Sequence, residues 1–212
     1  IYIFFLVIFI LKVCSYTSTI DFADPPDQYA HLSYIEYIQN TPFQFVPNFE
    51  DMRLEHSPLD DNNRMNYLSH PPLYYYLMTL ISENDSIETY IANLQLFNIF
   101  ISTLSYLLLL YIGYKMKVNT LAHFGYISLV SAIPMLPYIG ASINNDNLGI
   151  LSGMIFLIGL LKLIETPDSK YSYLLISVGL LLGYFTKLTV FLIMFFSLIF
   201  LVYYFIKKKI SI

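Results

Sequence analysis

Apolar residues gather in six long segments along the chain, separated by polar stretches of very unequal length. A helix of about 20 mainly apolar residues crosses a bilayer, so this pattern predicts an all-α polytopic membrane protein with about six transmembrane helices. The first segment is short for a span, and because the chain begins with Ile1 we expect further residues to precede it. The predicted spans cover residues 1–14, 90–114, 121–141, 148–164, 171–185 and 188–206.

One polar stretch, residues 16–89, is far longer than the others and predicts a large loop on one side of the membrane. Its first helix is expected over 28–39, where apolar residues recur at spacings of three and four. Asp24 or Asp27 can cap the start of that helix. Residues 41–68 show no clear period, so we predict an irregular segment there.

A second helix of this loop is predicted over 71–82, directly after the pair Pro71-Pro72, because proline is well tolerated in a first helical turn. The stretch is too short to cross a bilayer. Its tyrosine-rich, apolar composition suits the membrane interface. We therefore expect this helix, like the one over 28–39, to be interfacial and to lie on the membrane surface.

Lysine clusters set the expected orientation of the spans. The positive-inside rule places lysine-rich loops in the cytoplasm, and a cytoplasmic N-terminus satisfies it for all three clusters. The polar stretch, the turn at 142–148 and the break at Thr186–Lys187 then share the outer face. The clusters are Lys115 with Lys117, Lys162 with Lys170, and Lys207 with Lys208 and Lys209.

Composition agrees with a membrane location. The chain is 57% hydrophobic and only 12% charged, whereas a soluble domain carries roughly 25% charged residues. The formal net charge of −4 argues against a nucleic-acid partner. The single cysteine, Cys14, forms no internal disulfide and is expected to be a small buried hydrophobic residue.

Four short motifs carry a family resemblance through their order and spacing. Together they resemble the N-terminal half of a GT-C superfamily glycosyltransferase, in the branch of dolichyl-phosphate-mannose protein mannosyltransferases and aminoarabinose transferases. The resemblance covers nearly the whole chain and implies one GT-C-like transmembrane domain over 1–212 that lacks the later spans of such enzymes. The motifs are Asp27 at a helix start, His70-Pro71-Pro72-Leu73-Tyr74-Tyr75, Asn144-Asn145-Asp146-Asn147-Leu148, and Gly183-Tyr184-Phe185-Thr186-Lys187-Leu188-Thr189.

The resemblance implies transfer of a sugar from a polyprenyl-phosphate carrier to an acceptor, a protein or a glycolipid, on the outer or lumenal face. The membrane would be a bacterial plasma membrane or the endoplasmic reticulum. By position, Asp27 matches the acidic residue that is the proposed catalytic base, or faces a divalent metal cation, in this family. The family commonly has Asp-Glu where this chain has Asp27-Gln28, and glutamine cannot act as a base. If the second acid matters, Asp24 takes the role or activity is lost.

Other candidate residues have both a functional and an ordinary interpretation. His70 and Lys187 are expected to bind the phosphate of the donor, although an interfacial histidine and a lysine snorkelling to outer headgroups are the alternatives. His31 and Asp146 are expected to line the site, and Asp146 alternatively serves only its turn. Arg53 and Arg64 are weaker candidates for phosphate binding, and the other acidic residues of the loop fit a solvated surface better than a metal site.

Two functions from different classes follow. The first is a membrane glycosyltransferase that uses a lipid-phosphate-linked sugar. The second is a non-enzymatic membrane protein, such as a lipid or sugar carrier or an inactive relative. A carrier would be expected to place polar groups at mid-membrane in broken helices, whereas here the polar groups cluster at the predicted outer ends of the spans, which favours the enzyme.

Overall fold

The computed structural model describes residues 1–19, 27–55, 64–81, 86–116 and 118–210, and over these residues the chain is helical, with an isolated bridge between Arg53 and Met65 in place of any strand. The predicted all-α class is therefore confirmed. The helices are α1 (Tyr2–Thr19), α2 (Gln28–Asn40), α3 (Leu73–Met78), α4 (Ile87–Lys115), α5 (Thr120–Ser131), α6 (Met135–Gly140), α7 (Asp146–Glu165), α8 (Lys170–Thr186) and α9 (Leu188–Ile210).

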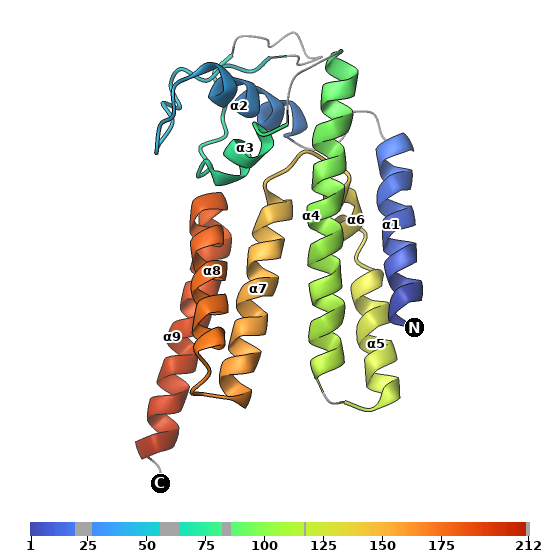
Figure 1. Cartoon of the computed structure of the whole chain (residues 1–212), viewed down its shortest axis with the longest axis vertical. Coiled ribbons are helices and arrows are strands. Elements are labelled where there is room, and N and C mark those ends of the chain that lie inside the picture. The colour runs from blue at the N-terminus through green and yellow to red at the C-terminus, as the bar shows by residue number, and fades with distance from the viewer. Residues whose placement is uncertain (20–26, 56–63, 82–85, 117, 211–212) are drawn as a thin grey trace.

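The long helices lie side by side, and α2 and α3 lie across one end of them (Figure 1). Among the described residues, α1, α4 and α7 are long and apolar enough to cross a membrane. α8 has 17 residues, and the apolar part of α9 runs over Leu188–Tyr203. The chain therefore has the character of a membrane protein.

The predicted span over 121–141 is wrong as a single helix. It forms α5 and α6, which are separated at residues 132–134. Pro134 has no backbone N–H to continue the ladder of α5, and its ring disfavours a helical conformation at Ile133. Pro134 instead stands at the N-cap position of α6, where a missing N–H costs nothing.

The predicted start of the polar loop at residue 16 is also wrong, because α1 continues to Thr19. The hydroxyls of this last turn bond back to the helix, with Thr17 donating to the Val13 carbonyl at 2.7 Å and Thr19 to the Ser15 carbonyl at 2.7 Å. Those bonds satisfy polar side chains without breaking the helix. At the other end of the loop, α4 begins at Ile87, where the Ser86 hydroxyl accepts from the Thr89 N–H.

The helix predicted over 28–39 is present as α2, which ends at Asn40. The helix predicted over 71–82 is present but covers only Leu73–Met78. Two of its tyrosines, Tyr74 and Tyr75, are fully buried in protein and lie on no exposed face. α3 lies between α2 and the ends of the long helices, and it contacts α2 and α8 (Figure 1).

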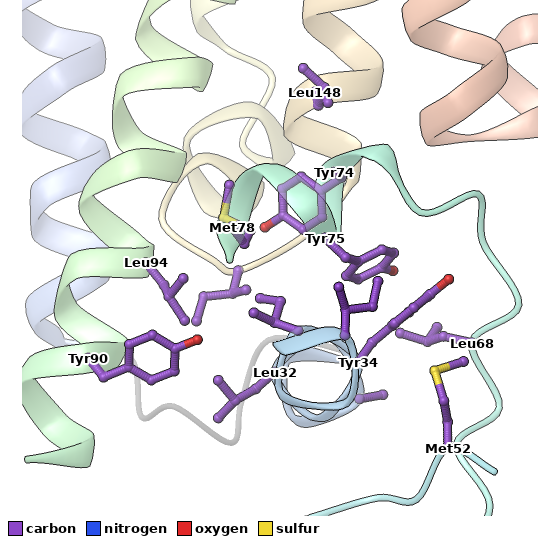
Figure 2. Close-up of a cluster of buried hydrophobic side chains, with 14 of the residues drawn as sticks. Leu32, Tyr34, Met52, Leu68, Tyr74, Tyr75, Met78, Tyr90, Leu94 and Leu148 are labelled. Atoms are coloured by element: carbon purple, nitrogen blue, oxygen red, sulfur yellow. The ribbon is translucent and has the colours of Figure 1, made fainter. Parts of the chain in front are cut away.

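This burial makes α2 and α3 part of one apolar core with α4 and the start of α7 (Figure 2). Burying a large apolar side chain contributes about 2 kcal/mol, so this shared core ties the two short helices firmly to the helix ends. The fully buried members are Leu32, Tyr34, Ile35, Met52, Tyr74, Tyr75, Met78, Leu94 and Ile143.

Two glycines let α7 and α8 pack closely. A Cβ on Gly179 would lie 2.8 Å from the backbone nitrogen of Phe156, and one on Gly159 would lie 2.8 Å from that of Ile176. Only a hydrogen fits such a gap. The close contact fixes α8, and the chain turns at the extended residue Lys187 between α8 and α9.

Candidate functional site

Three chain segments that lie far apart in the sequence meet at the end of the helices covered by α2 and α3. The side-chain amide oxygen of Gln28 accepts from the Ile143 N–H at 3.0 Å, which joins the start of α2 to the turn before α7. The side-chain amide of Asn145 donates to the Thr186 carbonyl at 3.2 Å, which joins that turn to the end of α8. The start of α2, the turn at 142–148 and the break at Thr186–Lys187 therefore lie together, as the prediction that they share a face requires.

Lys187 and Asp146 form an ion pair at the centre of this junction. The Lys187 Nζ donates to a carboxylate oxygen of Asp146 at 2.5 Å, and the two side chains retain 23% and 30% of their exposure. An ammonium has three N–H donors, so the pair leaves Lys187 able to donate to a further anion. The sequence suggested each residue separately. Their pairing could not be predicted from a local pattern, because the two residues are 41 positions apart.

Two histidines lie beside this pair. The rings of His31 and His70 stack with centroids 6.3 Å apart, and His31 Nδ1 shares a hydrogen bond of 2.9 Å with the Tyr75 hydroxyl. Burial, followed by the positive charges of His70 and Lys187, lowers the pKa of His31 to about 3. His31 is therefore neutral at physiological pH.

His70 is half-buried and has a lowered pKa for related reasons. Burial lowers it most and the charge of Lys187 lowers it further, while Asp146 and Asp27 act in the opposite direction. These charges act on His70 because Asp27, Asp146 and Lys187 all lie near its ring. The segment that carries His70 is held by a hydrogen bond of 2.8 Å from the Tyr34 hydroxyl to the His70 carbonyl.

Asp27 stands at the N-cap position of α2 but does not cap it. Its backbone is left-handed, with φ 66° and ψ 5°, and its side chain makes no capping hydrogen bond. Its exposed carboxylate instead accepts from the Tyr67 hydroxyl at 2.5 Å. Because the side chain makes no bond to the first turn of α2, the ordinary capping interpretation of Asp27 is wrong.

Gln28 has a structural role here. It is 1% exposed, and its amide oxygen receives the Ile143 N–H. A buried N–H without an acceptor would cost about 1–3 kcal/mol. The side chain therefore stabilises the joint between α2 and the turn before α7, a role that needs an acceptor and no charge.

A buried amide network, missed by sequence reasoning, lies directly beneath the site. The hydroxyl of Tyr74 and the side-chain amide of Asn147 both donate to the side-chain oxygen of Asn98, each at 2.9 Å. The network joins α3, α4 and α7. Asn98 itself could have indicated this network, because a side-chain amide inside a long apolar run is energetically costly unless it is hydrogen-bonded.

An apolar groove adjoins the polar cluster. It lies between the segment after α2 and the junction of α8 with α9. Ser69 and Leu188, the chain neighbours of His70 and Lys187, belong to its lining. The other lining residues are Phe45, Val46, Pro47, Phe49, Pro71, Pro72, Tyr184 and Phe185.

Asp24 and Arg53 were also predicted as candidates. Asp24 lies outside the described residues. Arg53 donates to the carbonyls of Glu50 and Met52 at 2.7 and 3.2 Å, and so braces its own loop. Within the described ranges, no three His, Cys, Asp or Glu residues gather as a metal site would require.

Acidification is expected to destabilise the protein through His31. Because the fold favours the neutral ring, the unfolded chain binds the extra proton as pH falls below 6.5, and stability is lost from there down to about pH 3 by roughly 1.4 kcal/mol per unit. Thermal midpoints of the wild type and His31→Gln between pH 7 and pH 5 test this. His123→Gln is the control variant. If the thermal midpoint of H31Q fell as steeply with decreasing pH as that of H123Q, the expectation would be contradicted.

No protein-family model matches the sequence, and searches of curated proteins and of solved structures found no match either.

Proposed function

We propose that the protein is a membrane glycosyltransferase that moves a sugar from a polyprenyl-phosphate donor to an acceptor on the outer or lumenal face. The observation that carries the proposal is the cluster of Asp27, His70 and Lys187, which come from separate motifs, with the charges of Asp27 and Lys187 both acting on His70. The cluster also lies beside an apolar groove. A lipid-linked substrate needs both a polar site for its phosphate and an apolar surface for its chain.

The proposed reaction is a direct displacement at the anomeric carbon. The carboxylate of Asp27 accepts the proton of the acceptor hydroxyl, whose oxygen attacks that carbon. The bond from the carbon to the phosphate oxygen breaks, and polyprenyl phosphate leaves. Lys187 stabilises the charge on the departing phosphate, while His70, neutral because its pKa is lowered, donates a hydrogen bond from its ring.

The ion pair with Asp146 prepares Lys187 for this task. It holds the ammonium at the junction of α7, α8 and α9 before the donor arrives. Preorganised charge costs little reorganisation at the moment of reaction. The tail of the donor would occupy the groove lined by Phe45, Pro72 and Phe185.

The proposed topology has six crossings, made by α1, α4, α5 with α6, α7, α8 and α9. It places the cluster outside and the lysine-rich ends inside, in accord with the positive-inside rule. Lys115 and Lys162 do lie together at the end of the helices opposite α2 and α3, where they line a common cavity.

A non-enzymatic lipid or sugar carrier, or an inactive relative, is the second candidate. The buried Gln28 favours the inactive relative, because it stands where the family commonly has an acid. Its bond to Ile143 supplies a structural reason for the amide, so this argument is weaker than the sequence alone implied.

Lys187→Gln is expected to weaken use of the donor by about 10- to 100-fold, because a hydrogen bond to a charged group contributes roughly 1.5–3 kcal/mol. The test reconstitutes the protein in liposomes with a panel of labelled polyprenyl-phosphate sugars and measures transfer to membrane protein and glycolipid. Lys12→Gln is the matched control, since Lys12 donates to the Ser131 carbonyl far from the cluster. Transfer by no member of the panel would reject the proposed function.

A further inference from the structure

A second cavity is lined by α4, α7 and α8. It lies toward the ends of these helices that are opposite α2 and α3, an arrangement that can be followed in Figure 1. Its inner wall is apolar and includes Leu108, Ile155 and Ile158. Its rim carries the lysines at the ends of α4 and α7. We propose that this cavity binds an anionic phospholipid, with the phosphate at the lysines and an acyl chain along the apolar wall.

The two lysines are held in place by aromatic rings. The Nζ of Lys162 lies 4.8 Å from the ring centroid of Tyr171, and the Nζ of Lys115 lies 5.6 Å from that of Tyr111. A cation over an aromatic face keeps its N–H donors available to an anion on its other side. Tyrosine beside lysine is also the composition that favours the level of lipid headgroups.

Charge selects an anionic headgroup over a zwitterionic one. Among the described residues that line the cavity, two are lysines and one, Glu165, is acidic, which leaves one excess positive charge. A phosphodiester headgroup carries the matching negative charge. In the topology proposed above this end faces the cytoplasm, the side on which anionic lipid concentrates.

The site does not depend on the transfer reaction, because no residue of the outer cluster lines it. Its test therefore uses lipid binding alone. The protein is purified in an uncharged detergent and titrated with phosphatidylglycerol or with phosphatidylcholine, and lipid adducts are resolved by native mass spectrometry. A parallel titration adds excess inorganic phosphate to separate a lipid headgroup from a free phosphate as the ligand.

The combined variant K115Q/K162Q is expected to bind phosphatidylglycerol roughly 30-fold more weakly, because it loses two positive charges that each strengthen binding of an anionic headgroup near the membrane surface. Lys170→Gln is the matched control, because Lys170 begins α8 at the same end but does not line the cavity. Glu165→Gln is expected to strengthen binding and tests the site without removing either lysine.

Equal binding of the two lipids by the wild type would overturn the proposal, as would a double variant that binds like the wild type. Displacement of the lipid by inorganic phosphate would identify a free anion as the ligand instead. Weaker binding by Glu165→Gln would show that the headgroup is not held by net positive charge. Circular dichroism confirms that each variant keeps its helical content.

Discussion

Asp27→Asn is expected to lower the rate of sugar transfer by about a thousandfold, within the range found for loss of a general base. Asparagine keeps the size of the side chain and accepts a hydrogen bond from Tyr67, but it cannot take a proton from the acceptor hydroxyl. The rate is measured under single-turnover conditions with saturating donor, so that binding does not enter. We expect affinity for the donor to stay near the wild-type value, because Lys187 and His70 are unchanged.

Two further variants separate the carboxylate from the backbone at this position. Asp27→Gly removes the carboxylate but adopts the left-handed conformation readily, so an equal loss in D27G and D27N assigns the effect to the carboxylate. Asp51→Asn is the matched control, because Asp51 is an exposed acid of the same loop that accepts from Asn48. Transfer by Asp27→Asn at the wild-type rate would remove Asp27 from the mechanism.

Local patterns predicted those parts of the fold whose causes are local. α2 could be located because prolines precede it and apolar residues recur at helical spacing, and it begins and ends within a residue of the prediction. The break between α8 and α9 at Lys187 was likewise visible as a polar interruption of an apolar run. Pro134 was also visible, yet a long apolar run outweighed it in the prediction of one span.

The burial of Tyr74 and Tyr75 on α3 was not predicted, because tyrosine suits two environments. A tyrosine-rich face fits a membrane interface, and it fits a protein interior equally well where each hydroxyl finds a partner. Tyr74 finds Asn98, and Tyr75 finds His31, across 24 and 44 positions of sequence. No pattern in a short window reveals partners at such distances.

The same reasoning applies to the candidate site. The sequence supplied Asp27, His70, Asp146 and Lys187 as separate candidates, since each has a residue type and position that suggested chemistry. It could not supply the ion pair between Asp146 and Lys187. Nor could it show that Gln28 is bonded to Ile143, because that bond exists only once α2 lies against the turn before α7.

Gly179→Leu is expected to destabilise the protein by about 3 kcal/mol, the upper part of the usual range for overpacking a core. Even a Cβ at this position would lie 2.7–2.9 Å from atoms of Phe156, two of which belong to the backbone of α7. Backbone atoms cannot move aside as the end of a flexible side chain can, so the two helices must separate. The thermal midpoint in detergent, followed by circular dichroism, reports the change.

Gly153→Leu is the matched control for this prediction, because it lies on α7 with nothing within 4 Å of the added Cβ. Leucine favours a helix over glycine by roughly 0.5–1 kcal/mol, so this variant is expected to be as stable as the wild type or more so. Separation of α7 and α8 would also displace Lys187 from Asp146, and transfer activity is therefore expected to fall with stability in G179L. Equal midpoints for G179L and G153L would show that α7 and α8 do not need their close contact.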